Sequence, residues 1–84
     1  MPRNRHKKYP VLDLHGYTTD EIFNLMDQHI TKYSHSPKVK IIVGKGTGAV
    51  KKKAVEYLKL GNYPWKYETI YGKINEGCLI VELN

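Results

Sequence analysis

The chain has 84 residues, 40% of them hydrophobic and 26% charged, which suits one small globular domain. Its single cysteine, Cys78, excludes an internal disulfide and is typical of a reducing compartment. No apolar run approaches the roughly 18 residues of a membrane-spanning helix, and no run resembles the h-region of a secretory signal. We therefore expect a cytoplasmic protein without a membrane partner.

The net charge of +6 is concentrated in two segments. Residues 1–8 carry four bases and no acid, and residues 38–53 carry six lysines and no acid. We predict that residues 1–8 form a flexible basic arm and that residues 9–84 form the domain. Clustered positive charge is typical of proteins that bind nucleic acid, with solubility alone as the alternative. The bases are Arg3, Arg5, Lys7, Lys8, Lys38, Lys40, Lys45, Lys51, Lys52 and Lys53.

The first half of the chain predicts a strand, a helix and a second strand. Residues 9–14 alternate as a strand, and Gly16 marks the turn that follows. Thr18 and Glu21 match a capping box, so a helix is expected to begin there and to continue to about residue 33. Pro37 ends it, because the residue before a proline disfavours the helical region. Residues 38–43 are the second predicted strand.

The second half predicts a loop, a helix and two strands. Residues 44–48 form a glycine-rich loop, and an apolar face over about residues 49–60 predicts a helix that ends at Gly61. Strands are expected at residues 65–71 and 78–83, joined by a hairpin loop over residues 72–77. The predicted order is β-α-β-α-β-β. Two strands joined by a helix should be parallel neighbours, so their ends should meet at one edge of the sheet.

Asp13 and His15 form one candidate site at the end of the first strand. They point to the same face, with Cα atoms about 6.6 Å apart, so the carboxylate is within reach of the imidazole. An Asp–His pair fixes the histidine tautomer and raises its basicity, and such a histidine can transfer a proton during phosphodiester cleavage. The alternative is a carboxylate that caps local N–H groups beside an exposed histidine.

The loop over residues 44–48 is the second candidate. Gly44, Gly46 and Gly48 allow backbone N–H groups to approach a phosphate at the positive end of the following helix, and Lys45 adds a charge. The alternative is a plain strand-to-helix turn. His29 is predicted to be a core or boundary residue, and Cys78 a buried, unreactive thiol. No metal-ligand spacing is found, so no structural metal is expected.

These motifs resemble those of the Smr (small MutS-related) domain family. The resemblance rests on L-D-L-H-G at residues 12–16, G-K-G-T-G at 44–48 and E-G-C-L-I-V-E-L at 76–83. It implies an α/β fold of two layers, in which a four-stranded mixed sheet carries two helices, like the C-terminal domain of a bacterial translation initiation factor. It also implies nucleic-acid binding, often with endonuclease activity, and links to DNA repair and to mRNA cleavage on ribosomes.

Carried over to this sequence, the Asp and His of the first family motif fall on Asp13 and His15, and the glycine motif falls on Gly44, Lys45, Gly46 and Gly48. We expect Asp13 and His15 to be catalytic and Lys45 to stabilise the charged transition state. We expect phosphate binding at Gly44, Gly46, Thr47 and Gly48, with flanking phosphates held by Arg3, Arg5, Lys7, Lys8, Lys40, Lys51, Lys52 and Lys53. We expect a monomeric endonuclease with RNA ahead of DNA as substrate and the ribosome as a further partner. No cofactor is expected, except magnesium if DNA is hydrolysed.

The sequence departs from the family pattern at Val43. The second motif of the family commonly reads H-G-x-G, and its histidine position is Val43 here. Acid–base cleavage usually needs one group to activate the nucleophile and another to protonate the leaving group. The alternative function is therefore a module that binds RNA or ribosomes without cleaving them. A third hypothesis is a protein-interaction domain whose charge serves solubility.

Overall fold

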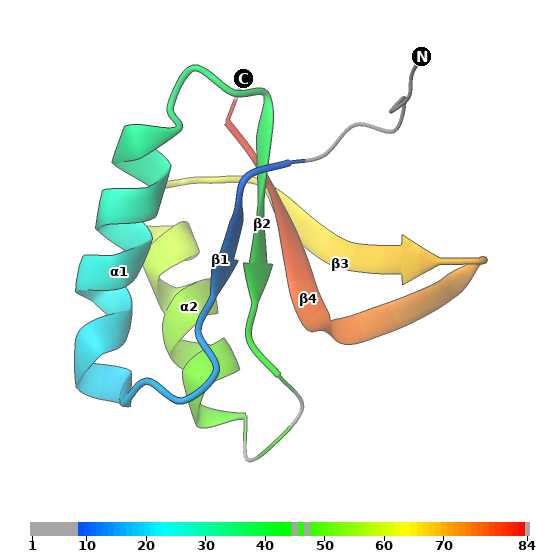
Figure 1. Ribbon diagram of the computed structural model, residues 1–84, viewed down its shortest axis with the longest axis horizontal. Helices are drawn as coiled ribbons and strands as arrows, with labels where there is room; N and C mark the ends of the chain where they lie inside the picture. The colour runs from blue at the N-terminus through cyan, green and yellow to red at the C-terminus, as the bar shows by residue number, and fades with distance from the viewer. Residues whose placement is uncertain (1–8, 45, 47, 84) are drawn as a thin grey trace.

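The computed structural model describes residues 9–44, 46 and 48–83, so the predicted basic arm lies outside the described residues. Its sheet has the strand order β1-β2-β4-β3, with β1 parallel to β2 and the other two pairs antiparallel (Figure 1). This arrangement confirms the predicted four-stranded mixed sheet with two helices. The elements are β1 (Val11–Asp13), α1 (Thr19–Lys32), β2 (Lys38–Ile42), α2 (Ala49–Leu60), β3 (Trp65–Ile70) and β4 (Lys73–Glu82).

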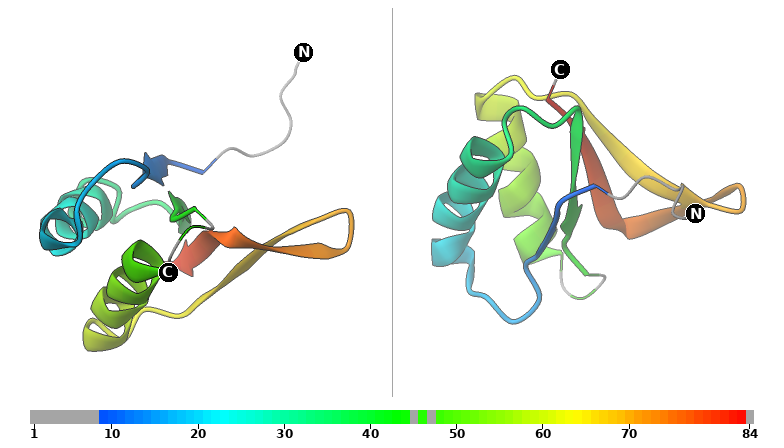
Figure 2. Two further views of the ribbon diagram at one scale, coloured as in Figure 1. Left: turned by 90° about the horizontal axis from the view of Figure 1, so that it is seen from below. Right: turned by 45° about the horizontal axis from the view of Figure 1, so that its top comes forward.

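Both helices pack on the same face of the sheet and form the second layer (Figure 2). The side chains that face them alternate along the strands, as Val39 and Ile41 of β2 and Leu79 and Val81 of β4 do. They pack against Ile22 and Met26 of α1 and against Ala54 and Leu58 of α2. Within the described ranges, neither helix is long and apolar enough to cross a bilayer.

The start of each helix follows from local sequence signals. The N–H of Thr18 donates a hydrogen bond to Glu21 Oε1 at 3.0 Å, which is part of the predicted capping box at the start of α1. Helix α2 occupies the predicted range. Strand β1 is shorter than the predicted residues 9–14, although the N–H of Leu14 still donates to the carbonyl of Ile42 at 2.9 Å.

The predicted hairpin loop over residues 72–77 is wrong. The chain turns at Tyr71 and Gly72 alone, both of which have positive φ angles of 49° and 80°, and β4 begins at Lys73. Residues 73–75 pair with residues 68–70 of β3. The pairing then jumps, because Tyr67 is opposite Leu79 while Glu68 is opposite Asn75. Residues 76–78 therefore form an irregularity inside β4. Gly77, which was predicted to end the hairpin loop, belongs to this irregularity.

Candidate nucleic-acid site

The ends of β1 and β2 meet at one edge of the sheet, as the topology predicted (Figure 1). Between them lies a groove of about 240 Å³, which we call the histidine groove. His15 and Gly16 line it from the turn after β1, and Gly44 and Gly46 from the loop after β2. Its remaining lining residues are Leu14, Val43, Gly48 and Val50. The structure thus brings together two motifs that are about thirty residues apart in the sequence.

Asp13 holds the turn that presents His15. Its Oδ1 accepts a hydrogen bond from the backbone N–H of His15 at 2.9 Å. Among the described residues, no hydrogen bond joins the Asp13 carboxylate to the His15 imidazole. Of the two interpretations of this pair, the contact corresponds to a carboxylate that caps a local N–H group beside an exposed histidine.

The glycine loop is held at its start by the irregularity in β4. The carbonyl of Gly77 accepts hydrogen bonds from the N–H of Val43 at 2.8 Å and of Gly44 at 3.1 Å. Gly44 then takes a φ of 78°, in the left-handed region that favours glycine. Lys45 and Thr47, which were assigned to phosphate contact, lie outside the described residues.

The loop leads directly into the N-terminus of α2. Gly48 is the N-cap with a φ of 88°, and the first turn of this helix carries no acid. The N-terminal end of a helix of twelve residues carries a partial positive charge. With lysines at positions 51 to 53, the electrostatics around the loop favour an anion such as phosphate.

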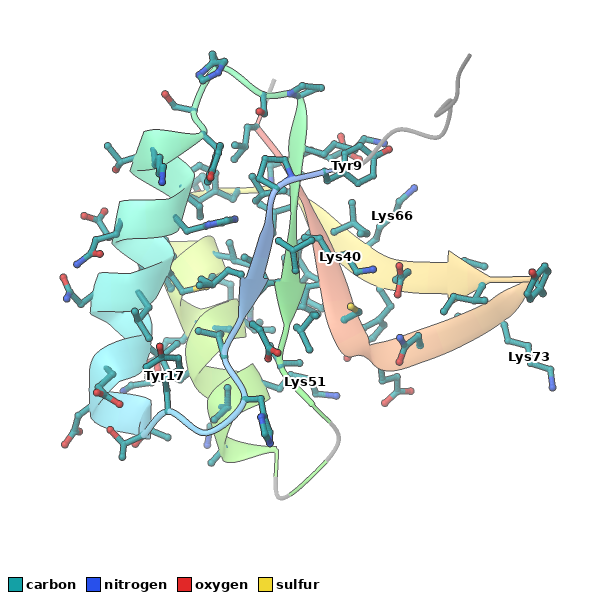
Figure 3. All side chains as sticks on the ribbon, in the orientation of Figure 1. Tyr9, Tyr17, Lys40, Lys51, Lys66 and Lys73 are labelled. Carbon is teal, nitrogen blue, oxygen red and sulfur yellow. The ribbon has the colours of Figure 1, made fainter. Side chains whose placement is uncertain are left out.

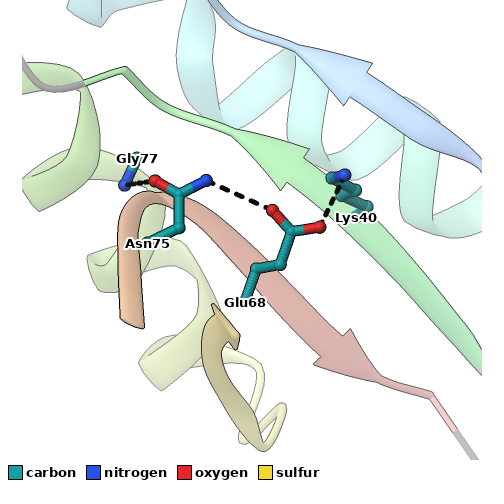
Figure 4. Close-up of polar contacts among 4 residues, drawn as sticks. All are labelled: Lys40, Glu68, Asn75 and Gly77. Atoms are coloured by element: carbon teal, nitrogen blue, oxygen red, sulfur yellow. Dashed lines mark hydrogen bonds and ion pairs between the residues drawn. The ribbon is translucent and has the colours of Figure 1, made fainter. Parts of the chain in front are cut away.

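A chain of polar contacts connects the start of the loop to the opposite side of the sheet (Figure 4). The N–H of Gly77 donates to Asn75 Oδ1 at 3.1 Å, and Asn75 Nδ2 donates to Glu68 Oε1 at 3.2 Å. Glu68 Oε2 lies 2.7 Å from Lys40 Nζ. The hydrogen bond with Glu68 raises the pKa of Lys40, so this lysine, predicted to contact nucleic acid, already has a carboxylate partner.

The three consecutive lysines of α2 point to different surroundings. Lys51 lies beside the glycine loop (Figure 3), where its Nζ donates to the hydroxyl of Tyr67 at 3.2 Å. Lys53 faces α1, with its Nζ 5.3 Å from the Phe23 ring centre. Lys52 lines a separate groove that includes Trp65 and Tyr67. Lys51 lines a further groove together with Gly44, Gly46 and Gly48 of the loop.

The groove that Lys51 lines with the three glycines has a volume of about 470 Å³ and extends from the glycine loop to β4. We call it the loop groove. Glu76 lines it, with its Oε1 3.6 Å from Lys51 Nζ, and so does Ile74. The sequence did not indicate these two residues, because positions 72–77 were assigned to a hairpin loop. Gly44, Gly46 and Gly48 line both the loop groove and the histidine groove, so the two grooves adjoin at the glycine loop.

Cys78 is buried, as predicted, and burial raises the pKa of its thiol to about 11, with the charge of Glu68 as a further cause. The thiol is therefore protonated at neutral pH and is a poor nucleophile. In the described part of the chain, no cluster of three or more His, Cys, Asp or Glu residues could hold a metal ion.

A two-layer α/β domain with a histidine turn and a glycine loop at one sheet edge defines a recognisable class. The family model of the Smr domain matches residues 12–84. The chain belongs to the Smr domain family.

The chain is similar to several proteins named Endonuclease MutS2. The chain is 34% identical to that of Fusobacterium nucleatum subsp. nucleatum over 86 residues, which cover 95% of this chain and 11% of the relative. It is 37% identical to that of Lachnoclostridium phytofermentans over 76 residues, which cover 87% and 10%. The chain thus spans about a tenth of the length of these relatives.

Two solved structures share the fold. The Smr domain of Thermus thermophilus MutS2 superposes with a TM-score of 0.78 at 24% identity, over 89% of this chain and 98% of that one. The SMR domain of NEDD4-binding protein 2 superposes with a TM-score of 0.62 at 22% identity, over 99% and 94%.

Proposed function

We propose that this domain binds nucleic acid at the glycine loop and cleaves phosphodiester bonds there, with RNA preferred over DNA. The observation that carries the proposal is that His15 and the glycines of the loop line one groove at the end of a basic helix. A phosphate bound at the loop would lie next to an exposed imidazole. The name Endonuclease MutS2, which the similar relatives carry, supports the same reaction.

In the proposed reaction His15 is the general base that accepts the proton of the nucleophile. It takes the proton of a ribose 2′-hydroxyl as that oxygen attacks phosphorus, and the bond from phosphorus to the 5′-oxygen breaks. The leaving 5′-oxygen takes a proton from solvent water, so the products are a 2′,3′-cyclic phosphate and a 5′-hydroxyl. Asp13 positions His15 by holding its backbone N–H, and Lys45 with the loop amides stabilises the charge that develops on phosphate.

RNA is the preferred substrate because the 2′-hydroxyl supplies the nucleophile within the substrate itself. This route requires no metal ion, whereas hydrolysis of DNA is expected to require magnesium to activate water. The expectations of a ribosomal partner, a monomeric state and a cytoplasmic location stay predictions.

A second candidate function is binding without cleavage, and Val43 favours it. Its side chain is buried in the core, and it lines the histidine groove together with the apolar Leu14 and Val50. The family histidine that would supply a second proton-transfer group is therefore replaced by an apolar side chain beside His15. Such a domain would keep the phosphate site and lose the reaction.

The test compares the wild type with His15→Ala on end-labelled RNA and on duplex DNA, with EDTA and with magnesium. Nuclease function predicts that His15→Ala lowers the RNA cleavage rate by about 100-fold or more while binding changes little. Cleavage in EDTA with a cyclic phosphate at the new 3′ end would support the 2′-hydroxyl route. Equal binding by both proteins with no cleavage by either would establish the second function.

Binding itself is tested by its salt dependence. Phosphate-driven affinity for RNA falls steeply as salt rises, because counterions are released from the backbone. Absent or salt-independent binding would contradict both nucleic-acid functions and favour a protein-interaction domain.

A further inference from the structure

The β3–β4 hairpin carries exposed apolar side chains at its tip. Tyr71 is 99% exposed, Ile74 66% and Ile70 48%. The hairpin extends away from both helices (Figures 1 and 2). Large apolar side chains that gather on an exposed projection mark an interaction surface more often than an isolated exposed residue does.

The backbone conformation of the tip is that of a regular hairpin turn, and this conformation does not favour a tyrosine. Cross-strand pairs reach the turn, since Thr69 is opposite Ile74 and Ile70 is opposite Lys73. The two turn residues have positive φ angles, as in a type I′ hairpin turn. Asn, Asp and Gly favour the first of these positions, and a bulky tyrosine does not. Tyr71 therefore destabilises the turn, and its exposed ring does not pack into the core.

Ile74 connects the tip to the phosphate site proposed above. Ile74 lines the loop groove together with Lys51 and the glycines, and it also lines an outer groove with Ile70, Tyr71, Lys73 and Asn75. One lysine stands at each end of this path: Lys51 lies beside the loop and Lys73 lies out on the hairpin (Figure 3). The two grooves that share Ile74 therefore extend from the glycine loop to the Tyr71 ring.

We propose that the hairpin tip, formed by Ile70, Tyr71, Lys73 and Ile74, binds unpaired bases of the strand whose phosphate lies at the glycine loop. This inference rests on the proposed function and adds the substrate class, single-stranded or looped nucleic acid. The Tyr71 ring stacks on a base face, Ile74 contacts the neighbouring base or sugar, and the Lys73 ammonium pairs with a phosphate. Bases within a duplex stack on each other, so their faces are closed to Tyr71.

The test uses strands that cannot be cleaved by the 2′-hydroxyl route. A 2′-O-methyl RNA strand that contains 2-aminopurine, and the duplex made from it, are titrated with wild type, Tyr71→Ala, Tyr71→Phe and Leu60→Ala. Leu60 is a matched control, because it is 70% exposed at the end of α2, outside the grooves around the loop. Circular dichroism checks that each variant is folded.

Stacking predicts a selective loss. Tyr71→Ala should weaken binding to the single strand about fivefold or more and abolish the quenching of 2-aminopurine, with less than about twofold change for the duplex. Tyr71→Phe should keep both properties, and Leu60→Ala should match the wild type.

Three outcomes would overturn the inference. If wild type and Tyr71→Ala bind the single strand equally, the tip makes no base contact, while the proposed function stands. If Tyr71→Ala weakens single strand and duplex alike, the tip does not distinguish unpaired bases. If the wild type binds neither strand at low salt, both the inference and the proposed function fail.

Discussion

Lys40 of β2 and Glu68 of β3 form an ion pair at 2.7 Å although their strands are not neighbours. Strand β4 lies between them, so the pair crosses it on the face opposite the helices. Glu68 also accepts a hydrogen bond from Asn75, whose side chain holds the N–H of Gly77. Because the carbonyl of Gly77 accepts the N–H groups of Val43 and Gly44, the ion pair and the glycine loop belong to one connected network.

Glu68→Gln is expected to lower the free energy of unfolding by about 1 kcal/mol, because it leaves a partly buried Lys40 without its charged partner. The pKa of Glu68 is lowered, first by the hydrogen bond with Lys40 and then by that with Asn75. The stabilisation is therefore present above the unfolded pKa and is lost as pH falls through the lowered pKa of the folded state. Urea denaturation at neutral and acidic pH measures both effects.

A double-mutant cycle with Lys40→Met isolates this pair. A coupling free energy of zero between positions 40 and 68 would contradict the prediction. Lys53→Met with Glu56→Gln is the matched control, since that pair is longer, at 3.6 Å, and more exposed.

Glu76→Gln is expected to raise the affinity for RNA by about threefold at low salt. The Glu76 carboxylate lies 3.6 Å from Lys51 Nζ and lines the groove in which the phosphate is proposed to bind. Its removal frees the lysine and removes a charge that repels phosphate. Fluorescence anisotropy with an uncleavable RNA strand measures the change.

Glu56→Gln is the control for Glu76, since it removes the same charge from an ion pair of the same length with Lys53, away from the loop groove. Its effect on affinity should be smaller. The gain from Glu76→Gln should shrink as salt is raised, because screening weakens the interactions of exposed charges. An equal gain from both variants would mean that net charge alone decides binding.

Much of the fold could be predicted because local signals and topology agree. The capping box of Thr18 and Glu21 and the apolar face over residues 49–60 placed the helices. The turn at Tyr71 and Gly72 could not be predicted, because tyrosine is disfavoured at positive φ and two turn-forming residues, Asn75 and Gly77, follow close by. Cross-strand pairing overrode that local preference.

The candidate site was predictable in its position and less so in its contacts. Parallel pairing of β1 and β2 was enough to bring His15 to the glycine loop. The partner of the Asp13 carboxylate depends on the side-chain rotamers of Asp13 and His15, which the sequence does not determine. The carboxylate could have bound the His15 imidazole, but it accepts the backbone N–H of His15 instead. The Gly77 carbonyl holds the start of the glycine loop only because β4 is irregular there. Lys40 of β2 pairs with Glu68 of β3, which is not a neighbouring strand. No local sequence pattern predicts either contact.

His29 is expected to make stability fall with pH below about neutrality. It is 9% exposed on α1, and its Nε2 is buried without a hydrogen-bond partner in the described residues. Burial lowers the pKa of His29; a backbone hydrogen bond with Pro10 raises it in part, and the charge of Lys32 lowers it further. The folded state therefore binds the proton less well than the unfolded state, whose pKa is 6.5. Stability is complete above that value and is lost as pH falls below it.

Thermal melts across this window, for wild type and His29→Leu, measure the effect. The melting temperature of the wild type should fall with pH between about 7.5 and about 5, and that of His29→Leu should fall less. His35→Gln is the control, because His35 is exposed in the connection after α1. Equal pH dependence in His29→Leu and the wild type would show that other groups carry it.

Val43→His tests whether the apolar residue at this position limits cleavage. The side chain of Val43 is buried in the core and also borders the histidine groove, so a histidine here would lie beside His15. We expect the RNA cleavage rate to rise by about tenfold or more, because a second group becomes available to protonate the leaving oxygen. The same change should lower the free energy of unfolding by about 1–3 kcal/mol, since an imidazole replaces a buried valine. Gel assays on end-labelled RNA and urea denaturation measure the two effects.

Val43→Asn separates proton transfer from polarity. It places a polar side chain at the same position, without a group that titrates near neutral pH, so it should lose stability and gain no activity. Any activity gained by Val43→His should disappear when His15→Ala is added, because the two groups would act on one reaction. A folded Val43→His that cleaves no faster than the wild type would mean that position 43 does not limit the reaction. The choice between nuclease and binding module would then depend on His15 alone.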